Sequence, residues 1–192
     1  MALLAASTPG SLTSYSLGLR VLGKSVFDHA PSVPRYLMVA AGTKMPEVEG
    51  WKTCRPNNIS HVTRVDRWRH TVQKFAIFAL TQFQRVLFLD ADTLVVGSLG
   101  ELWRWPIPNG ISLAAVQDYQ RADERLPFWH PNQTWTRAPW FNTGVMLARP
   151  NATFYRELLH ATSTHALPFL KDGVSHVGGA VQSEQDILNG LV

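Results

Sequence analysis

Hydrophobic positions along this chain recur with the period of a helix in some segments and form short continuous runs in others. Apolar residues at spacings of three and four predict an amphipathic helix that extends to about His29: Leu12, Tyr15, Leu19, Leu22 and Val26. The same spacing over residues 68–79 predicts a second helix. Two further helices are expected over residues 151–161 and 183–191.

Short apolar runs between these helices predict buried strands over residues 2–6, 35–40, 59–65, 86–89, 111–116 and 141–148. Strands that alternate with helices are typical of βαβ crossovers, which bring the strands side by side in parallel. The pattern therefore predicts an α/β fold with a mainly parallel sheet covered on both faces. No repeat, linker or low-complexity block divides the 192 residues, so we expect one domain.

Composition adds little to this picture except on the ligand. The net charge is +4 and the pI about 9.5, which is compatible with an anionic or phosphorylated ligand. The basic residues are scattered, without the basic stripe or stacking motif of nucleic-acid-binding proteins, so no nucleic-acid partner is expected. The patterns do not predict an oligomeric state.

Targeting signals are equally sparse. The single cysteine, Cys54, excludes an internal disulfide and a cysteine-rich zinc site. The N-terminal segment lacks the basic region of a signal peptide, and no apolar run reaches ~20 residues, so we expect no membrane segment. A cytoplasmic location is favoured, with the Golgi lumen open if a longer natural chain carries an anchor. N-glycosylation motifs begin at Asn58, Asn132 and Asn151, and Asn151 is alternatively the cap of the helix that follows Pro150.

Residues 18–25 read G-L-R-V-L-G-K-S, which matches the phosphate-binding P-loop pattern G-x-x-x-x-G-K-[ST]. A P-loop requires a strand that runs directly into its first glycine and a helix that begins near its lysine. Here the preceding strand ends about ten residues earlier, and Gly18 and Gly23 lie inside the predicted amphipathic helix. We therefore interpret the match as coincidental.

A second motif, D-x-D, follows the apolar strand 86–89. Asp90 and Asp92 are delivered to the carboxyl end of that strand, where open α/β sheets bind ligands. In an extended segment, side chains at i and i+2 point to the same side, and two nearby carboxylates repel each other unless a cation lies between them. Oxygen ligands suit magnesium or manganese. Aspartates that merely form a turn at a strand end remain the alternative.

Four segments in this order resemble the glycosyltransferases of family 8, the glycogenin-like group: Leu-Asp90-Ala-Asp-Thr-Leu-Val, Leu99-x-Glu-Leu-Trp103, Phe141-Asn-Thr-Gly-Val-Met146 and Ser183-Glu-Gln-Asp-Ile-Leu-Asn189. The resemblance extends from the first strand to the last residue. It implies the GT-A fold, a nucleotide-sugar donor that is usually linked to UDP, a manganese ion (magnesium being possible), and retention of anomeric configuration.

The resemblance also implies roles for individual residues. Asp90 and Asp92 match the manganese ligands, and Ala91 lies where the family contacts the ribose. Lys74 matches a lysine that reaches the donor, although a lysine that merely extends from a helix face is an open alternative. The resemblance assigns hydrogen bonds to the donor sugar to Asn142 and Thr143, and close backbone approach to Gly144; a plain β-bulge is the alternative there.

Five more positions follow from the same resemblance. Asp118 matches an aspartate that holds sugar hydroxyls, and a plain turn residue at the end of a strand is the alternative. Glu184 and Gln185 stand where the family has Asp-Gln, with Gln185 near the reacting anomeric carbon and Glu184 longer by one methylene than the usual residue. Thr8 and Tyr15 match contacts to the uracil side of the nucleotide, although the loop between them is longer than usual and contains a proline.

The chain departs from the family pattern at its C-terminal end. A histidine on a later strand is the third metal ligand of the family, and none of the seven histidines here lies in such a context. We therefore expect a GT-A catalytic domain that is incomplete at its C-terminus. Two alternatives to a glycosyltransferase stay open, an inactive nucleotide-sugar-binding domain and a P-loop phosphotransferase. The aromatic-rich loop over residues 121–140 is either a sugar-stacking wall or a loop packed onto the core.

Overall fold

A computed structural model describes residues 2–7, 12–39, 48–57, 59, 71–118, 141–164 and 187–188. Within them the strands are β1 (Ala2–Ser7), β2 (Arg35–Val39), β3 (Lys52–Cys54), β4 (Val86–Leu89), β5 (Leu113–Gln117) and β6 (Phe141–Ala148), which form one sheet in the order β3-β2-β1-β4-β6-β5. Strands β3, β2, β1 and β4 pair in parallel, whereas β6 is antiparallel to both β4 and β5. Only β6 is therefore reversed, and the prediction of a mainly parallel α/β sheet is confirmed.

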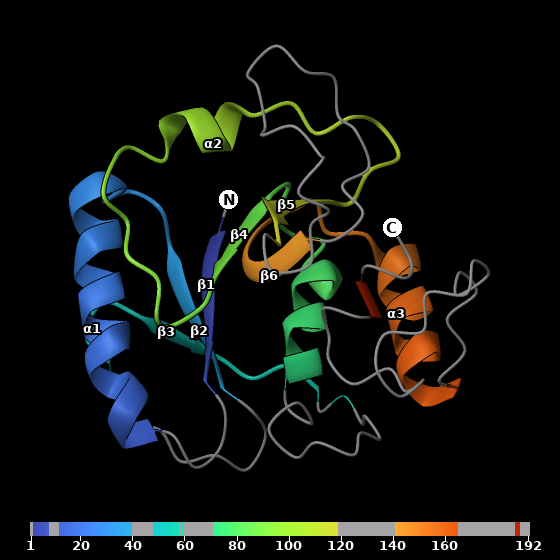
Figure 1. The fold of residues 1–192 in the computed structure, drawn as a ribbon, viewed down its shortest axis with the longest axis horizontal. Coiled ribbons are helices and arrows are strands. Elements are labelled where there is room, and N and C mark those ends of the chain that lie inside the picture. The colour runs from blue at the N-terminus through green and yellow to red at the C-terminus, as the bar shows by residue number, and fades with distance from the viewer. Residues whose placement is uncertain are drawn as a thin grey trace.

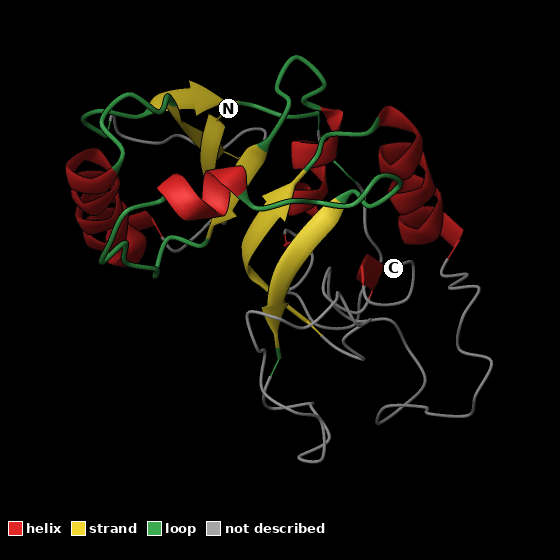
Figure 2. Cartoon of the chain, turned by 90° about the horizontal axis from the view of Figure 1, so that it is seen from above, coloured by secondary structure: helices red, strands yellow, loops and turns green. Residues whose placement is uncertain are grey.

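Helices cover both faces of this sheet (Figures 1 and 2). On one face lies α1 (Leu12–His29), and on the other lie the 3₁₀ helix η2 (Thr71–Ala79) and α3 (Ala152–Thr164). The central strand β4 contacts both layers because its side chains alternate: Phe88 packs with η2 and α3, and Leu87 packs with α1. All four residues of β4 are buried, as expected for a strand covered on both sides.

The helix α1 has the bounds that its apolar spacing predicts. Its apolar residues Leu19, Leu22 and Val26 are completely buried against the sheet. At α3 the predicted cap is confirmed, because the Asn151 side-chain oxygen accepts hydrogen bonds from the backbone N–H groups of Thr153 and Phe154. Asn151 thus has a structural role whether or not its glycosylation motif is used.

Three local features differ from the predictions. Residues 71–79 form a 3₁₀ helix, with three residues per turn, where the apolar spacing predicts an α-helix. Strand β3 and the five-residue helix α2 (Gly100–Arg104) are absent from the predictions. The predicted strand over residues 59–65 lies outside the described residues except for Ile59, and only Ile187 and Leu188 of the predicted last helix are described.

In the described part of the chain, no helix combines the length and the apolar character needed to cross a membrane.

Candidate functional site

The candidate site lies where β4 ends and β6 begins. Asp90 directly follows β4, and Asp118 directly follows β5, which runs in the same direction as β4 because both are antiparallel to β6. The first residues of β6, Phe141 and Asn142, pair with the last residues of β5. The predicted residues Asp90, Asp118 and Asn142 are therefore at one edge of the sheet, the carboxyl edge that open α/β sheets use for ligands.

Residues 90–93 form a tight turn, here called the aspartate turn. The Asp90 carbonyl accepts hydrogen bonds from the Thr93 backbone N–H at 3.0 Å and from the Thr93 hydroxyl at 2.7 Å. The expectation of an extended D-x-D segment is wrong, because this pair of hydrogen bonds folds the chain back at Asp90. The turn leaves Asp92 exposed and Asp90 partly buried, so the aspartates differ in their surroundings.

A bulge in β6 brings the next group of predicted residues to this turn. Val116 of β5 pairs with Asn142, but the preceding Ala115 pairs with Met146, so residues 143–145 bulge out of the β5 ladder. Within the bulge, the Gly144 carbonyl accepts a hydrogen bond from the Asp90 backbone N–H at 2.8 Å. The β-bulge that the sequence left as an alternative is thus present, and it places Gly144 against the aspartate turn.

Lys74 reaches the site from η2, which lies on the face of the sheet opposite α1. Its ammonium nitrogen lies 3.0 Å and 3.1 Å from the two carboxylate oxygens of Asp90 and 3.5 Å from the Thr143 hydroxyl. It also lies 5.3 Å from the centroid of the Phe88 ring, in cation–π range. The Lys74 side chain is only 10% exposed, so it is held in the site rather than extended into solvent.

The absence of a side chain at Gly144 lets two side-chain oxygen atoms approach its backbone closely. A methyl group there would lie 2.9 Å from the side-chain oxygen of Asn142 and 3.2 Å from a carboxylate oxygen of Asp90. The Asn142 oxygen also accepts a hydrogen bond from the Gly144 backbone N–H, which fixes its direction. Any larger residue at position 144 would displace these oxygens.

The described residues include neither a metal-ligand cluster nor a cysteine with a lowered pKa. Among the described residues, no three or more histidine, cysteine, aspartate or glutamate side chains cluster as metal ligands would. Burial raises the pKa of the Cys54 thiol, which keeps it protonated and poorly nucleophilic near neutral pH. Burial likewise raises the pKa of the Tyr155 hydroxyl on α3.

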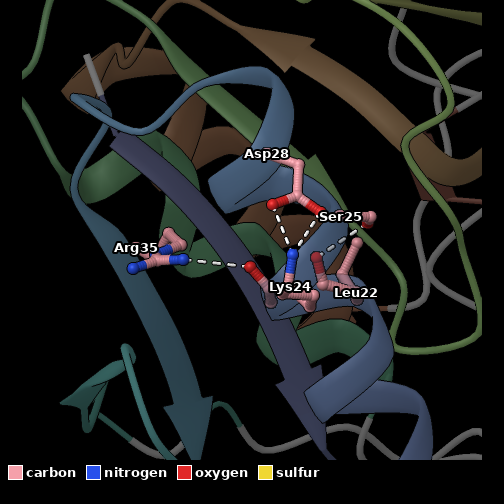
Figure 3. A network of polar contacts seen from close by, with 6 residues as sticks. Leu22, Lys24, Ser25, Asp28 and Arg35 are labelled. Carbon is pink, nitrogen blue, oxygen red and sulfur yellow. Dashed lines mark hydrogen bonds and ion pairs between the residues drawn. The ribbon is translucent and has the colours of Figure 1, made fainter.

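The P-loop hypothesis is wrong, because residues 18–25 lie within α1. Lys24 is about 18 Å along the helix from its first residue, at 1.5 Å per residue, so it cannot meet a phosphate held at the helix N-terminus. Figure 3 shows what the motif residues do instead. Lys24 forms an ion pair with Asp28 on the exposed face, and the Ser25 hydroxyl donates a hydrogen bond to the Leu22 carbonyl.

The remaining predicted residues divide into two groups. Ala91 is buried within the aspartate turn, and the backbone of Tyr15 lies in the first turns of α1. Thr8, Glu184, Gln185 and the aromatic-rich loop over 121–140 lie outside the described residues, so their predicted roles stay predictions.

Two contacts at the site were not predicted from the sequence. The ion pair between Lys74 and Asp90 joins residues that were assigned separately to the donor and to the metal. Thr93, which closes the aspartate turn, received no role. A threonine three residues after an aspartate at a strand end is a turn signal, and it is the one signal that would have identified this hydrogen bond.

Known proteins resemble this chain in sequence and in fold. The sequence model of glycosyl transferase family 8 matches residues 54–190, most of the chain. Inositol phosphorylceramide glucuronosyltransferase 1 of Arabidopsis thaliana is 25% identical over 157 residues, which are 78% of this chain and 25% of that protein. Human glycogenin-1 is 26% identical over 162 residues, 78% of this chain and 40% of glycogenin-1. The chain thus spans less than half the length of either relative.

Solved structures agree on the fold. The galactosyltransferase LgtC, in complex with donor and acceptor sugar analogues, superposes with a TM-score of 0.69 at 20% identity, covering 100% of this chain and 70% of LgtC. Mouse xyloside xylosyltransferase 1 superposes with a TM-score of 0.61 at 14% identity, covering 99% of this chain and 80% of that enzyme. These likenesses show the GT-A glycosyltransferase fold.

Proposed function

This chain belongs to glycosyltransferase family 8, and from that premise we propose that it transfers a sugar from a UDP-sugar to an acceptor hydroxyl with the help of a divalent metal ion. The sugar is a hexose or a related sugar, and transfer retains the anomeric configuration, as the family resemblance implies. Membership in the family supports sugar transfer in general. The donor, the metal and the stereochemistry are the finer parts of the proposal.

One observation carries the proposal: β4, β6 and η2 bring the Asp90 carboxylate and the Thr143 hydroxyl within hydrogen-bonding distance of the Lys74 ammonium. These residues are separated by up to 69 positions in sequence, so no local motif assembles them. A carboxylate, a hydroxyl and an ammonium at the carboxyl edge of a sheet are suited to a ligand that carries phosphates and sugar hydroxyls.

The residues at this edge fit a hard divalent cation. The side-chain oxygens of Asn142 and Asp90 both lie beside the α-carbon of Gly144, and Asp92 is exposed two residues further along the turn. Oxygen donors of this kind bind Mn²⁺ or Mg²⁺ in preference to softer metals. We propose that Asp90 and Asp92 hold the ion, whose positive charge would stabilise the diphosphate of the departing nucleotide.

The other residues bind and orient the donor in this proposal. Lys74 donates its ammonium protons to donor oxygens, and Ala91 presents its backbone to the ribose. Asn142, Thr143 and Asp118 hydrogen-bond the sugar. The family resemblance also assigns contacts to the uracil to Thr8 and Tyr15, and contacts near the anomeric carbon to Glu184 and Gln185.

The test is a calorimetric titration of the chain with UDP, once with Mn²⁺ and once with a chelator. We expect binding that requires Mn²⁺ and that is lost in Asp92→Asn, because this change removes a proposed metal ligand from an exposed position of the turn. Asp28→Asn is the matched control, since it removes another exposed carboxylate, from the far part of α1, and is expected to leave binding unchanged.

A panel of UDP-sugars, followed by release of UDP in the presence of acceptor alcohols, then identifies the donor. UDP binding that is equally tight in the chelator would contradict the metal-assisted proposal. Metal-dependent binding of every UDP-sugar with no turnover of any would instead identify an inactive nucleotide-sugar-binding domain.

A further inference from the structure

The segment that follows the aspartate turn lies along helix α1. Figure 1 shows residues 91–99 running beside α1, from the carboxyl end of β4 to α2. Two contacts fix this arrangement. One joins Gly18 to Ala91, inside the aspartate turn, and the other joins Ser25 to Val95, just beyond it. Gly18 and Ser25, two residues of the coincidental P-loop match, therefore contact the backbone of the segment that begins at the proposed metal ligands.

Gly18 permits the first contact because it lacks a side chain. A methyl group on Gly18 would lie 2.6 Å from the carbonyl oxygen of Ala91, well inside the normal separation of such atoms. The obstacle is a backbone carbonyl and not the end of a flexible side chain. Ala91 is the residue between Asp90 and Asp92, so a substitution at Gly18 must move the peptide that joins the two carboxylates.

Ser25 makes the second contact with a hydroxyl that is used twice. It donates to the Leu22 carbonyl at 2.9 Å, as Figure 3 shows, and it accepts a hydrogen bond from the Val95 backbone N–H at 3.2 Å. Ser25 is only 8% exposed, so little water is available to replace either bond. Removing the hydroxyl would leave the Val95 N–H without this acceptor.

The two contacts belong to one continuous interface between α1 and the segment that includes Ala91 and Val95. Gly18 and Ser25 are separated by seven positions, close to two helical turns, so they lie on the same face of α1 about 10 Å apart. Ala91 and Val95 are separated by four positions, and a chain of that length reaches at most about 14 Å, so the segment that leaves the turn can span the distance between the two contacts. Helix α1 therefore fixes the position of the end of the aspartate turn and of the residues that follow it.

We infer that Gly18 and Ser25 are positioning residues for the metal-binding aspartate turn, an inference that rests on the proposed function. They touch neither the donor nor the metal, and they act through the backbone of residues 91–95. Opposite α1, the Gly144 carbonyl holds the Asp90 N–H, so the turn is fixed from β6 and from α1 together.

The experiment measures UDP affinity with Mn²⁺ and with a chelator for the wild-type chain, Gly18→Ala, Ser25→Ala and Gly23→Ala. Gly23→Ala is the matched control. It makes the same change in the same helix, but its methyl group meets the Trp51 side chain and not the aspartate turn. We expect Mn²⁺-dependent affinity to fall about tenfold in Gly18→Ala and about fivefold in Ser25→Ala, the loss of roughly one hydrogen bond in the latter. Gly23→Ala stays within about twofold of wild type.

A second readout separates positioning from general stability. In Ser25→Ala, amide hydrogen exchange at Val95 becomes faster, whereas the Trp103 amide, which donates to the Leu99 carbonyl, keeps its wild-type rate. The bound-Mn²⁺ signal in electron paramagnetic resonance weakens in parallel with UDP affinity. If Gly18→Ala does not fold, Ser25→Ala, which adds no atoms, decides the matter.

Each outcome has one meaning. Wild-type affinity in both Gly18→Ala and Ser25→Ala would overturn the inference while leaving the proposed function intact. An equal loss in Gly23→Ala would also overturn it, because the effect would then belong to the helix in general. A wild-type chain that binds no UDP in Mn²⁺ would sink the proposed function itself, and the inference with it.

Discussion

Two lysine–aspartate pairs of this protein show how the same chemistry differs between a helix surface and a sheet edge. Lys24 and Asp28 are one helical turn apart on α1, and their side chains are 72% and 46% exposed. Lys74 and Asp90 come from different elements, and their side chains are 10% and 33% exposed. Lys24 is also the lysine of a phosphate-binding sequence pattern, whereas no such pattern contains Lys74.

The difference teaches that burial and convergence, not the local pattern, indicate which pair is the candidate for function. A surface pair gains little because water and salt screen it, and holding two long side chains together costs entropy. A partly buried pair interacts more strongly and is costly to leave uncompensated, so it persists where other interactions require it. Lys74 makes such further interactions, with the Thr143 hydroxyl and with the Phe88 ring.

The largest difference between the two pairs is expected when the aspartate of each pair is replaced by asparagine. Asp90→Asn should abolish Mn²⁺-dependent UDP binding and lower the free energy of unfolding by about 2 kcal/mol, since the charge facing the buried ammonium is removed. Asp28→Asn should keep full binding and cost less than about 0.5 kcal/mol. Calorimetry and urea denaturation measure both quantities. Equal effects of the two substitutions would erase the distinction between the pairs.

Replacing the lysine of each pair by glutamine should give the next largest contrast. We expect Lys74→Gln to weaken UDP binding in Mn²⁺ about tenfold, the value of a charged hydrogen bond to a donor oxygen. In the absence of nucleotide, the same change should strengthen Mn²⁺ binding, because a positive charge beside Asp90 is lost. Lys24→Gln should leave both affinities within about twofold of wild type. Paramagnetic resonance of Mn²⁺, with and without UDP, records the two opposite changes, and an equal loss of affinity in Lys24→Gln would erase the contrast between the two lysines.

The smallest contrast concerns a pair of buried threonine hydroxyls. Thr143 lies next to Lys74, whereas the Thr162 hydroxyl donates to the Leu159 carbonyl within α3. Thr143→Val should reduce UDP affinity about threefold, because one neutral hydroxyl is lost from the proposed sugar contacts. Thr162→Val should leave UDP affinity unchanged. The same titration measures both, and an unchanged affinity in Thr143→Val would remove Thr143 from the donor site.

Much of the fold could be predicted from the sequence because its main elements have strong periodicity. The α1 helix has apolar residues at regular spacing over five turns, β4 is a continuous apolar run, and β6 ends in one. Strand β3 could not be predicted, since it has three largely exposed residues and exists by pairing with β2. Helix α2 has five residues and no side-chain cap at its start, so it too lacks a local signal.

The sequence could predict which residues meet at the sheet edge, but not the geometry in which they meet. Asp90, Asn142 and Gly144 follow from strand ends and from the family resemblance, and the structure brings them to one edge. The turn at Asp90 depends on Thr93, and the ion pair with Lys74 depends on how η2 docks, which no local pattern encodes. For the same reason, Gly18 and Ser25 matched a motif whose chemistry they do not perform.

The separation in sequence of the residues around Asp90 has a consequence for the order in which the protein folds. Lys74 and Asp90 are 16 residues apart, but Lys74 and Thr143 are 69 apart. Closing the longer loop costs about 1.3 kcal/mol more chain entropy, and such distant pairings form late. We therefore expect the ion pair to form while β6 is still undocked. The chain would gain the ability to bind a nucleotide only at the final step, when the reversed strand joins the sheet.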